Sequence, residues 1–320
     1  MLFQHAASHG TGQGGHQHRV QGMVADSGLY AEYRPQGLQE AQVAPDSPEA
    51  LASIPALGVE DLPKENSRIP EDISQGALVT LCHDQPTQGI GYATLLLPME
   101  AVPDELVPLL PLFARSLTEM GTAKHDFSSF GAYIAAKTGG VSAGFGVGTE
   151  LGSRKFFRYF SLGGKAVYDK MDELFAIFEE ALLEPLTDQE CALERIGEML
   201  LETRSRLEEA YQAAGNAVIS TRLAARYTEA GSFAERTWGV HYLESVRRYL
   251  EVFGKDPKKL LEGLERLRRA LVRQKDGIFS CTAEQTALSG LCDRARALFA
   301  KLPEQTETSR VLLPEPTMCA

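Results

Sequence analysis

Two histidines near the start of the sequence have a spacing that could bind zinc. On a helix, His5 and His9 would share one face, as do the two imidazoles of the peptidase motifs H-E-x-x-H and H-x-x-E-H. Residues 6–8 between them are Ala-Ala-Ser, so no glutamate is present to act as general base. No amphipathic pattern predicts a helix around the pair. We therefore interpret it as a chance feature of a disordered tail and predict no metal ligand.

A glycine-rich stretch raises the possibility of phosphate binding. Gly144, Gly146 and Gly148 form G-x-G-x-G, but Thr149 stands where the dinucleotide fingerprint G-x-G-x-x-G needs its last glycine. The stretch also leads into another predicted strand, whereas a phosphate site needs the N-terminus of a helix. We interpret these glycines as part of a strand that another backbone approaches closely. No cofactor-binding residue is predicted.

The cysteines do not form a recognisable motif. There is no C-x-x-C pair and the count is odd, which favours a reducing compartment and an interpretation as small buried hydrophobic residues. The five are Cys82, Cys191, Cys281, Cys292 and Cys319. No G-x-S-x-G nucleophile motif occurs either. The sequence therefore predicts no catalytic residue.

Charge indicates which partners to expect. The net charge is −11, which argues against nucleic acid and against anionic lipid surfaces. No apolar run approaches the roughly 20 residues of a membrane helix. Arg154, Lys155 and Arg158 border a predicted strand and could face an acidic partner or a peptide. Surface solubility explains these three residues equally well.

Hydrophobic patterns divide the chain into four parts. Residues 1–47 are predicted to be a disordered Gly/Gln/His-rich tail, 48–75 a proline-rich linker, 76–303 an α+β domain, and 304–320 a loose tail. Within the domain the predicted order is a strand, two helices, two strands, a long helical block, a strand and a helix. The predicted strands are 90–97, 141–148, 155–162 and 277–282. Such an order predicts a small, mostly antiparallel sheet with helices on one face.

One segment resembles a known family. The run GIGYATLLLPMEAVPDELVPLLPLFARSLTEMGTAKHDFSSFGAYIAAKTGGVSA (89–143) closely resembles the first domain of the C-terminal half of presequence proteases. These belong to the pitrilysin/insulysin clan of zinc metallopeptidases. PLLPLFARSLTEMGT and KTGGVSA are its most specific parts. The resemblance covers roughly residues 48–303, with 48–70 similar to the end of the linker between the two halves.

The resemblance implies a function that depends on other domains. In the family, four related α+β domains form two bowl-shaped halves that close around an unstructured peptide. The first domain carries H-x-x-E-H and a distal Glu, and the last supplies an Arg and a Tyr. By the resemblance this chain corresponds to neither, so no zinc ligand or base is carried over to any residue here. The implied role is a non-catalytic, chamber-forming part of a zinc metalloendopeptidase, inactive alone, with zinc only in the full-length family enzyme.

The implied partners are the remaining domains of the peptidase, or an equivalent partner chain, and an unstructured peptide substrate. The implied compartment is the mitochondrial matrix or a plastid, and otherwise the cytoplasm. The alternative is a stand-alone, non-peptidase interaction or assembly subunit of the same fold. An in-frame upstream H-x-x-E-H favours the first hypothesis, and its absence favours the second. Both hypotheses predict a sizeable exposed hydrophobic patch.

Overall fold

The computed structural model describes residues 44–64, 69–149, 155–184 and 189–304. The His5–His9 pair, Arg154 and nearly all of both predicted tails lie outside the described residues. The chain divides into two units, Met1–Ser67 and Arg68–Ala320. In the first unit, the described elements are α3 (Pro48–Ala52) and the 3-10 helix η1 (Val59–Asp61). Neither contains a buried residue, so a hydrophobic core is found only in the described part of the second unit.

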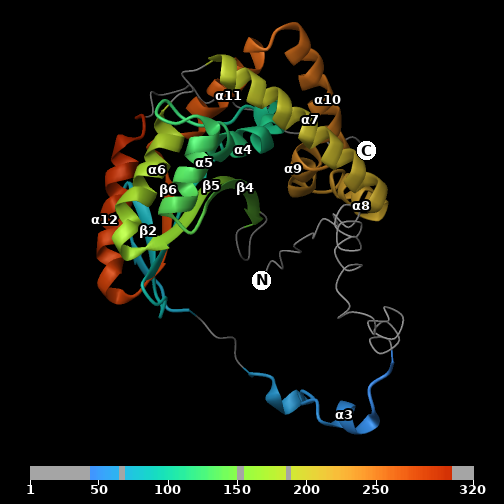
Figure 1. The fold of residues 1–320 in the computed structure, drawn as a ribbon, viewed down its shortest axis with the longest axis vertical. Helices are drawn as coiled ribbons and strands as arrows, with labels where there is room; N and C mark the ends of the chain where they lie inside the picture. Colours follow the sequence, from blue (N-terminus) through green and yellow to red (C-terminus); the bar gives the residue numbers. More distant parts are fainter. Residues whose placement is uncertain (1–43, 65–68, 150–154, 185–188, 305–320) are drawn as a thin grey trace, which may run out of the picture. The chain divides into compact units, whose positions relative to one another are not determined.

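The second unit is built around one six-stranded sheet (Figure 1). Its strands are β1 (Asp72–Ser74), β2 (Leu78–Asp84), β3 (Ile90–Pro98), β4 (Val141–Thr149), β5 (Phe156–Val167) and β6 (Gly277–Ala283). The spatial order is β1-β2-β6-β3-β5-β4. β2 and β6 pair in parallel and the other described pairings are antiparallel, so the predicted mostly antiparallel sheet is confirmed.

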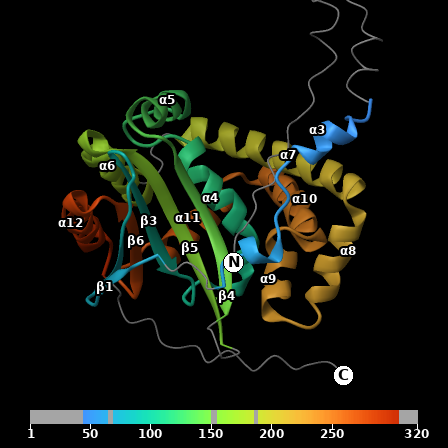
Figure 2. The same cartoon turned by 90° about the horizontal axis from the view of Figure 1, so that it is seen from below.

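Helices pack on one face of this sheet, as predicted (Figure 2). The covering elements are η2 (Asp104–Leu109), α4 (Leu110–Glu119), α5 (Phe127–Lys137), η3 (Tyr168–Lys170), α6 (Met171–Leu183), α11 (Lys258–Leu271) and α12 (Gln285–Lys301). A second helical group follows the chain between α6 and α11. It consists of α7 (Gln189–Ala213), α8 (Gly215–Ala224), α9 (Glu229–Thr237) and α10 (Val240–Lys255). In Figures 1 and 2 this group lies on the β4 side of the sheet.

Buried and exposed side chains alternate along the strands, and the buried ones form the core between the sheet and the helices. On β3 the inward positions are Gly91, Ala93, Leu95 and Leu97, and all four are buried. The rings of Phe113 on α4 and Phe160 on β5 lie 5.4 Å apart, and those of Phe175 on α6 and Phe279 on β6 lie 6.0 Å apart. These aromatic pairs join both halves of the sheet to the helical layer.

Two prolines lie at the start of α4. Pro108 lies in the 3-10 helix η2, and Pro111 occupies the first turn of α4, where its missing N–H is tolerated. Two strands were not predicted, namely the short edge strand β1 and its neighbour β2. Among the described residues, no helix is both long and apolar enough to cross a membrane.

Candidate functional site

The face of the sheet opposite the covering helices is the first candidate. Odd-numbered residues of β5 point toward this face, because even-numbered ones such as Phe160 and Leu162 pack under the helices. We call it the open sheet face and define it by the outward residues of three strands. They are Tyr92, Thr94 and Leu96 of β3, Gly144, Gly146 and Gly148 of β4, and Phe157, Tyr159, Ser161, Gly163 and Lys165 of β5. Figure 2 looks onto this face.

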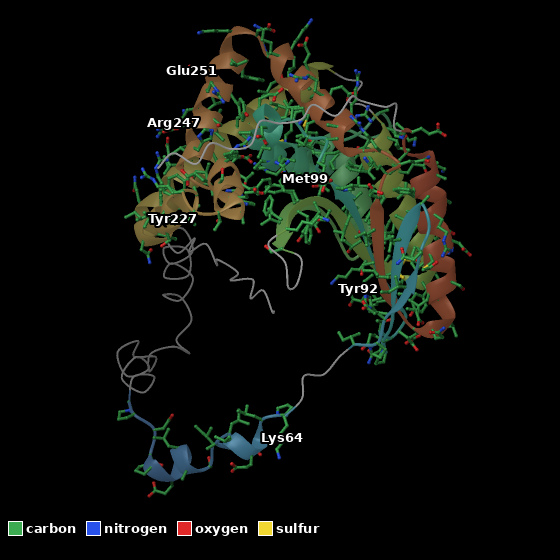
Figure 3. All side chains as sticks on the ribbon, turned by 180° about the vertical axis from the view of Figure 1, so that it is seen from behind. Lys64, Tyr92, Met99, Tyr227, Arg247 and Glu251 are labelled. Atoms are coloured by element: carbon green, nitrogen blue, oxygen red, sulfur yellow. The ribbon has the colours of Figure 1, made fainter. Side chains whose placement is uncertain are left out.

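Large apolar side chains are exposed on the open sheet face. Tyr92 is 41 % exposed and Phe157 is 42 % exposed. Tyr92 projects from β3 (Figure 3), and the Lys165 Nζ lies 5.9 Å from the centre of its ring. Burying such rings against a ligand is favourable, and an ammonium group over a ring adds to the attraction. This part of the sheet therefore has the character of a contact surface.

The glycines of β4 make room for two of these rings. Gly146 lies opposite Tyr159, and a Cβ at position 146 would lie 2.6 Å from the tyrosine ring. Gly148 lies opposite Phe157, whose ring occupies the space of a Cβ there in the same way. The interpretation that another backbone approaches these glycines is therefore wrong, because the neighbours are aromatic side chains. The glycines allow the rings of β5 to spread over β4.

β4 is also an edge strand. It pairs with β5 on one side, and among the described strands nothing pairs with its other side. Phe145 of β4 stacks on Trp238 with ring centres 5.6 Å apart, and it meets Phe233 of α9 at 5.9 Å. These contacts hold β4 against the second helical group. The unpaired side presents main-chain N–H and C=O groups that another extended chain can bind.

The three basic residues singled out in the sequence do not meet on this face. Arg154 is outside the described residues, and Lys155 is an exposed residue just before β5. Arg158 points to the helical side, where its guanidinium lies 3.4 Å from an Asp104 carboxylate oxygen. Asp104 also forms an ion pair with Arg236 of α9, at 3.4 Å. Asp104 thus links Arg158 of β5 to Arg236 of α9, whereas a peptide-facing role for Lys155 stays a prediction.

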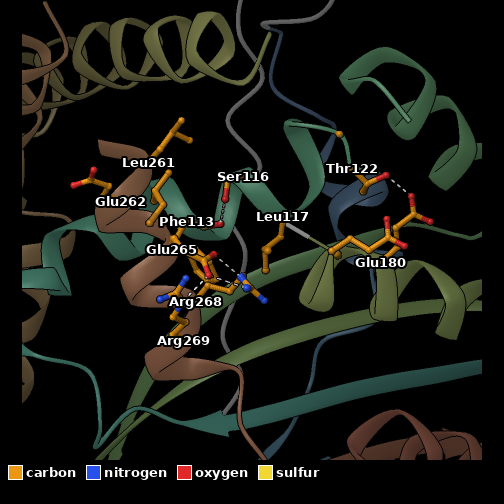
Figure 4. A pocket seen from close by; sticks show the side chains of 14 residues that line it. Phe113, Ser116, Leu117, Thr122, Glu180, Leu261, Glu262, Glu265, Arg268 and Arg269 are labelled. Carbon is orange, nitrogen blue, oxygen red and sulfur yellow. Dashed lines mark hydrogen bonds and ion pairs between the residues drawn. The ribbon is translucent and has the colours of Figure 1, made fainter. Parts of the chain in front are cut away.

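A cavity of about 530 Å³ lies on the helical side, between α4, α6 and α11 (Figure 4). Its apolar lining includes Phe113 and Leu117. Glu265 accepts hydrogen bonds from both Arg268 and Arg269, and the Arg268 bond is the main reason that its pKa is lowered. Glu180, which is buried, accepts from the Thr122 hydroxyl. These carboxylates are engaged with neighbouring side chains, so they are interpreted as structural.

One group of potential metal ligands occurs among the described residues. It consists of Cys82, Cys281 and Cys292, whose Sγ atoms all lie within 4.8 Å of one another. No comparable His–Glu group of the hydrolytic zinc type is found in the described part of the chain. The sequence does not reveal this cluster, because the three cysteines form no motif along the chain. Only the pairing of β2 with β6 shows that two of them are neighbours.

The comparisons with known proteins agree with the resemblance. Residues 30–248 match the family model of the domain associated with peptidases of family M16, subfamily C. Presequence protease 1, chloroplastic/mitochondrial, of Arabidopsis thaliana is 29% identical over 269 residues, which cover 83% of this chain and 24% of that protein. Protein HypA of Clostridium perfringens is 27% identical, covering 82% of this chain and 27% of that protein. The mitochondrial presequence protease of Saccharomyces cerevisiae is 26% identical, covering 77% and 25%.

A solved structure supports the fold. The peptidase M16 inactive domain from Pseudomonas fluorescens superposes with a TM-score of 0.50 at 15% identity, covering 75% of this chain and 53% of that one. The chain spans about a quarter of the length of the curated relatives named above. The predicted α+β fold and the resemblance to presequence proteases are thus confirmed. Because the family model matches more than half of its residues, the chain belongs to the family of domains associated with subfamily C of the M16 peptidases.

Proposed function

We propose that this chain forms a non-catalytic wall of the peptide chamber of a zinc metalloendopeptidase resembling presequence protease. It acts in peptide degradation together with a catalytic domain that lies elsewhere. The observation that carries the proposal is the open sheet face, on which Phe157 and Tyr159 lie over the glycines of β4. Its aromatic and hydroxyl side chains supply contacts, while the zinc and the general base are assigned to another segment.

The face suits an unstructured peptide because it recognises little of the peptide's sequence. An extended chain can add to the edge of β4 that no described strand pairs with, through main-chain hydrogen bonds that form with any residue except proline. Beside that edge, the rings of β5 offer apolar contact to side chains of many kinds. Weak and general contacts of this kind hold varied peptides without selecting one.

We also propose a compartment and domain boundaries for this chain. Relatives named as chloroplastic or mitochondrial favour the mitochondrial matrix or a plastid. We propose residues 48–75 as a proline-rich linker, whose last residues form the edge strand β1 (Asp72–Ser74), and 76–303 as the α+β domain. The partners are the remaining peptidase domains or an equivalent chain.

Photo-crosslinking tests whether the open sheet face contacts peptide. A photoreactive phenylalanine derivative replaces Phe157 in the native polypeptide, and in a matched variant it replaces Phe127, which is 53 % exposed on the helical side. An unstructured peptide is expected to crosslink at position 157 and not at 127. Equal crosslinking at the two positions would show that the open sheet face has no special role.

Cleavage assays test whether the chain needs a separate catalytic domain to degrade peptides. The 320-residue chain alone is expected to leave an unstructured fluorogenic peptide intact. The native polypeptide, if it is longer than 34.9 kDa by immunoblot, is expected to cleave the peptide, and a chelator should abolish that activity. Cleavage by the chain alone would overturn the proposal.

The alternative, a stand-alone assembly subunit, is favoured by one observation. Ile219 and Leu223 of α8 and the following Tyr227 are spaced four residues apart and are 63 %, 52 % and 82 % exposed (Figure 3 labels Tyr227). Such an apolar stripe on a helix is typical of a surface that packs on a partner. A native polypeptide of 34.9 kDa that associates with no zinc peptidase chain would support this second function and reject the first.

A further inference from the structure

Three thiols from two distant parts of the sequence meet beneath α12. Cys82 on β2 and Cys281 on β6 are register partners in neighbouring parallel strands, and Cys292 reaches them from the helix. The Sγ atoms of Cys82 and Cys292 are 2.8 Å apart, those of Cys82 and Cys281 are 3.5 Å apart, and those of Cys281 and Cys292 are 3.7 Å apart. None of the three is in a disulfide.

Strand alternation and helix periodicity explain this convergence. Cys281 shares its side of β6 with Phe279 and Ala283, all of them buried. Cys292 lies on the buried stripe of α12 with Leu288 and Leu291. The fold therefore places two thiols in the interface between sheet and helix, and the third beside them.

The cluster can be reached from solvent. Cys82 is half-buried, whereas Cys281 is 1 % exposed and Cys292 is 5 % exposed. A cavity of about 290 Å³ is lined by Cys82 and Cys292, and also by Thr80, Asp293 and Arg296. It provides an entry path and room for a water molecule beside the sulfur atoms. The Thr80 hydroxyl lies in its wall and is buried.

We infer that Cys82, Cys281 and Cys292 form a binding site for one thiophilic metal ion of the zinc, cadmium or copper(I) class. Thiolates bind zinc at about 2.3 Å, which sets neighbouring sulfur atoms roughly 3.8–4.0 Å apart in tetrahedral or trigonal geometry. Two of the three Sγ separations are already close to this spacing. The third must open by about 1 Å, which a rotation of the half-buried Cys82 side chain allows.

A metal ion binds thiolates, so each of the three thiols must lose its proton when it becomes a ligand. Binding then breaks S–H bonds, forms metal–sulfur bonds and releases the protons to water, and no electrons are transferred.

The rival chemistry is a disulfide between the closest pair, Cys82 and Cys292. It requires a two-electron oxidant such as glutathione disulfide, and it would leave the Cys281 thiol unused. The convergence of three thiols favours ligation over oxidation.

The test is a titration of the fully reduced, metal-free 320-residue chain with Cd²⁺ in the absence of oxygen. We expect a thiolate-to-metal charge-transfer band that saturates at one equivalent. Serine variants at positions 82, 281 and 292 should each weaken binding by at least about tenfold, since each removes a ligand. Cys191→Ser and Cys319→Ser are the matched controls and should bind as the unaltered chain does.

A second measurement does not depend on variants that fold. One equivalent of Zn²⁺ should protect Cys82, Cys281 and Cys292 from alkylation in the unaltered chain, as mapped by mass spectrometry of its peptides. The inference is overturned if reduced chain binds no Cd²⁺, or if Cys292→Ser binds it as tightly as the unaltered chain. It is equally overturned if the chain forms a Cys82–Cys292 disulfide in glutathione disulfide and, once reduced, gains no protection from Zn²⁺.

Discussion

Gly146 on β4 lies directly opposite Tyr159 on β5, and the tyrosine ring occupies the space that any side chain at position 146 would need. The glycine is therefore required by an aromatic neighbour, and not by an unusual backbone angle. The pair links the geometry of the edge strand to the composition of the open sheet face.

Substitution of Gly146 tests this relationship. Gly146→Val should push the Tyr159 ring aside and destabilise the chain by about 1–3 kcal/mol, the usual range for overpacking. Urea unfolding followed by circular dichroism measures the change. Gly144→Ala is the control, because a Cβ there lies 3.5 Å from the Ser161 hydroxyl, an ordinary contact. Equal effects of the two substitutions would contradict the role assigned to the tyrosine ring.

The two faces of β5 should respond differently to truncation. Phe160→Ala removes a fully buried ring from the core and should cost about 3–5 kcal/mol of unfolding free energy. Phe157→Ala removes a ring that is 42 % exposed and should cost roughly 1 kcal/mol. In the native polypeptide, Phe157→Ala should lose less stability than Phe160→Ala and should also lose affinity for unstructured peptide. Denaturation midpoints and peptide-binding isotherms check both statements.

An ion-pair network between α4 and α7 predicts a pH dependence of stability. Arg115 donates a hydrogen bond to Glu202 at 2.8 Å, and this bond is the main reason that the pKa of Glu202 lies below its usual 4.5. A lowered pKa means that the folded state favours the charged carboxylate. The ionised Glu202 carboxylate therefore stabilises the fold in full above pH 4.5. This stabilisation is lost as the pH falls through the lower pKa that Glu202 has in the folded state.

Glu202→Gln should accordingly lower stability at pH 7 by less than about 1 kcal/mol, because the carboxylate is half exposed. The difference from the unaltered chain should shrink below about pH 4. Glu209→Gln on the same helix is the control and should show no such convergence. Unfolding curves at several pH values measure this difference in stability. If the difference between Glu202→Gln and the unaltered chain grows in acid, the stabilising role assigned to the Glu202 carboxylate is wrong.

The hydrogen bonds of Tyr211 predict the strength of one helix junction. Its single hydroxyl hydrogen is shared between the carbonyl oxygens of Trp238 and Gly239, at O···O distances of 2.9 Å and 2.6 Å, which ties α7 to the turn between α9 and α10. Tyr211→Phe should cost about 1 kcal/mol, because two carbonyls lose a donor. Limited proteolysis should show faster cleavage near residue 238. Tyr227→Phe, on an 82 % exposed ring, should leave both readouts unchanged.

Local signals in the sequence predicted several elements correctly. The predicted strands 90–97 and 277–282 correspond to β3 and β6, because each is a short apolar run. β1 was missed because Asp-Ile-Ser is too short to show a period. The cysteine cluster was missed for a different reason: Cys82 and Cys281 are 199 residues apart, and only the register of β2 on β6 brings them together. In the same way, only the register of β4 on β5 shows that aromatic rings lie opposite Gly146 and Gly148.

The position of β6 has a consequence for how this domain is made. β6 belongs between β2 and β3, yet it is the last of the described strands to leave the ribosome. Until residues 277–283 emerge, β2 and β3 each have an unfilled edge on either side of the same gap. Closing the sheet then requires contacts across nearly 200 residues, which slows folding and exposes the nascent chain to aggregation. The domain should therefore complete its fold only at the end of its own translation, and chaperones should bind it until then.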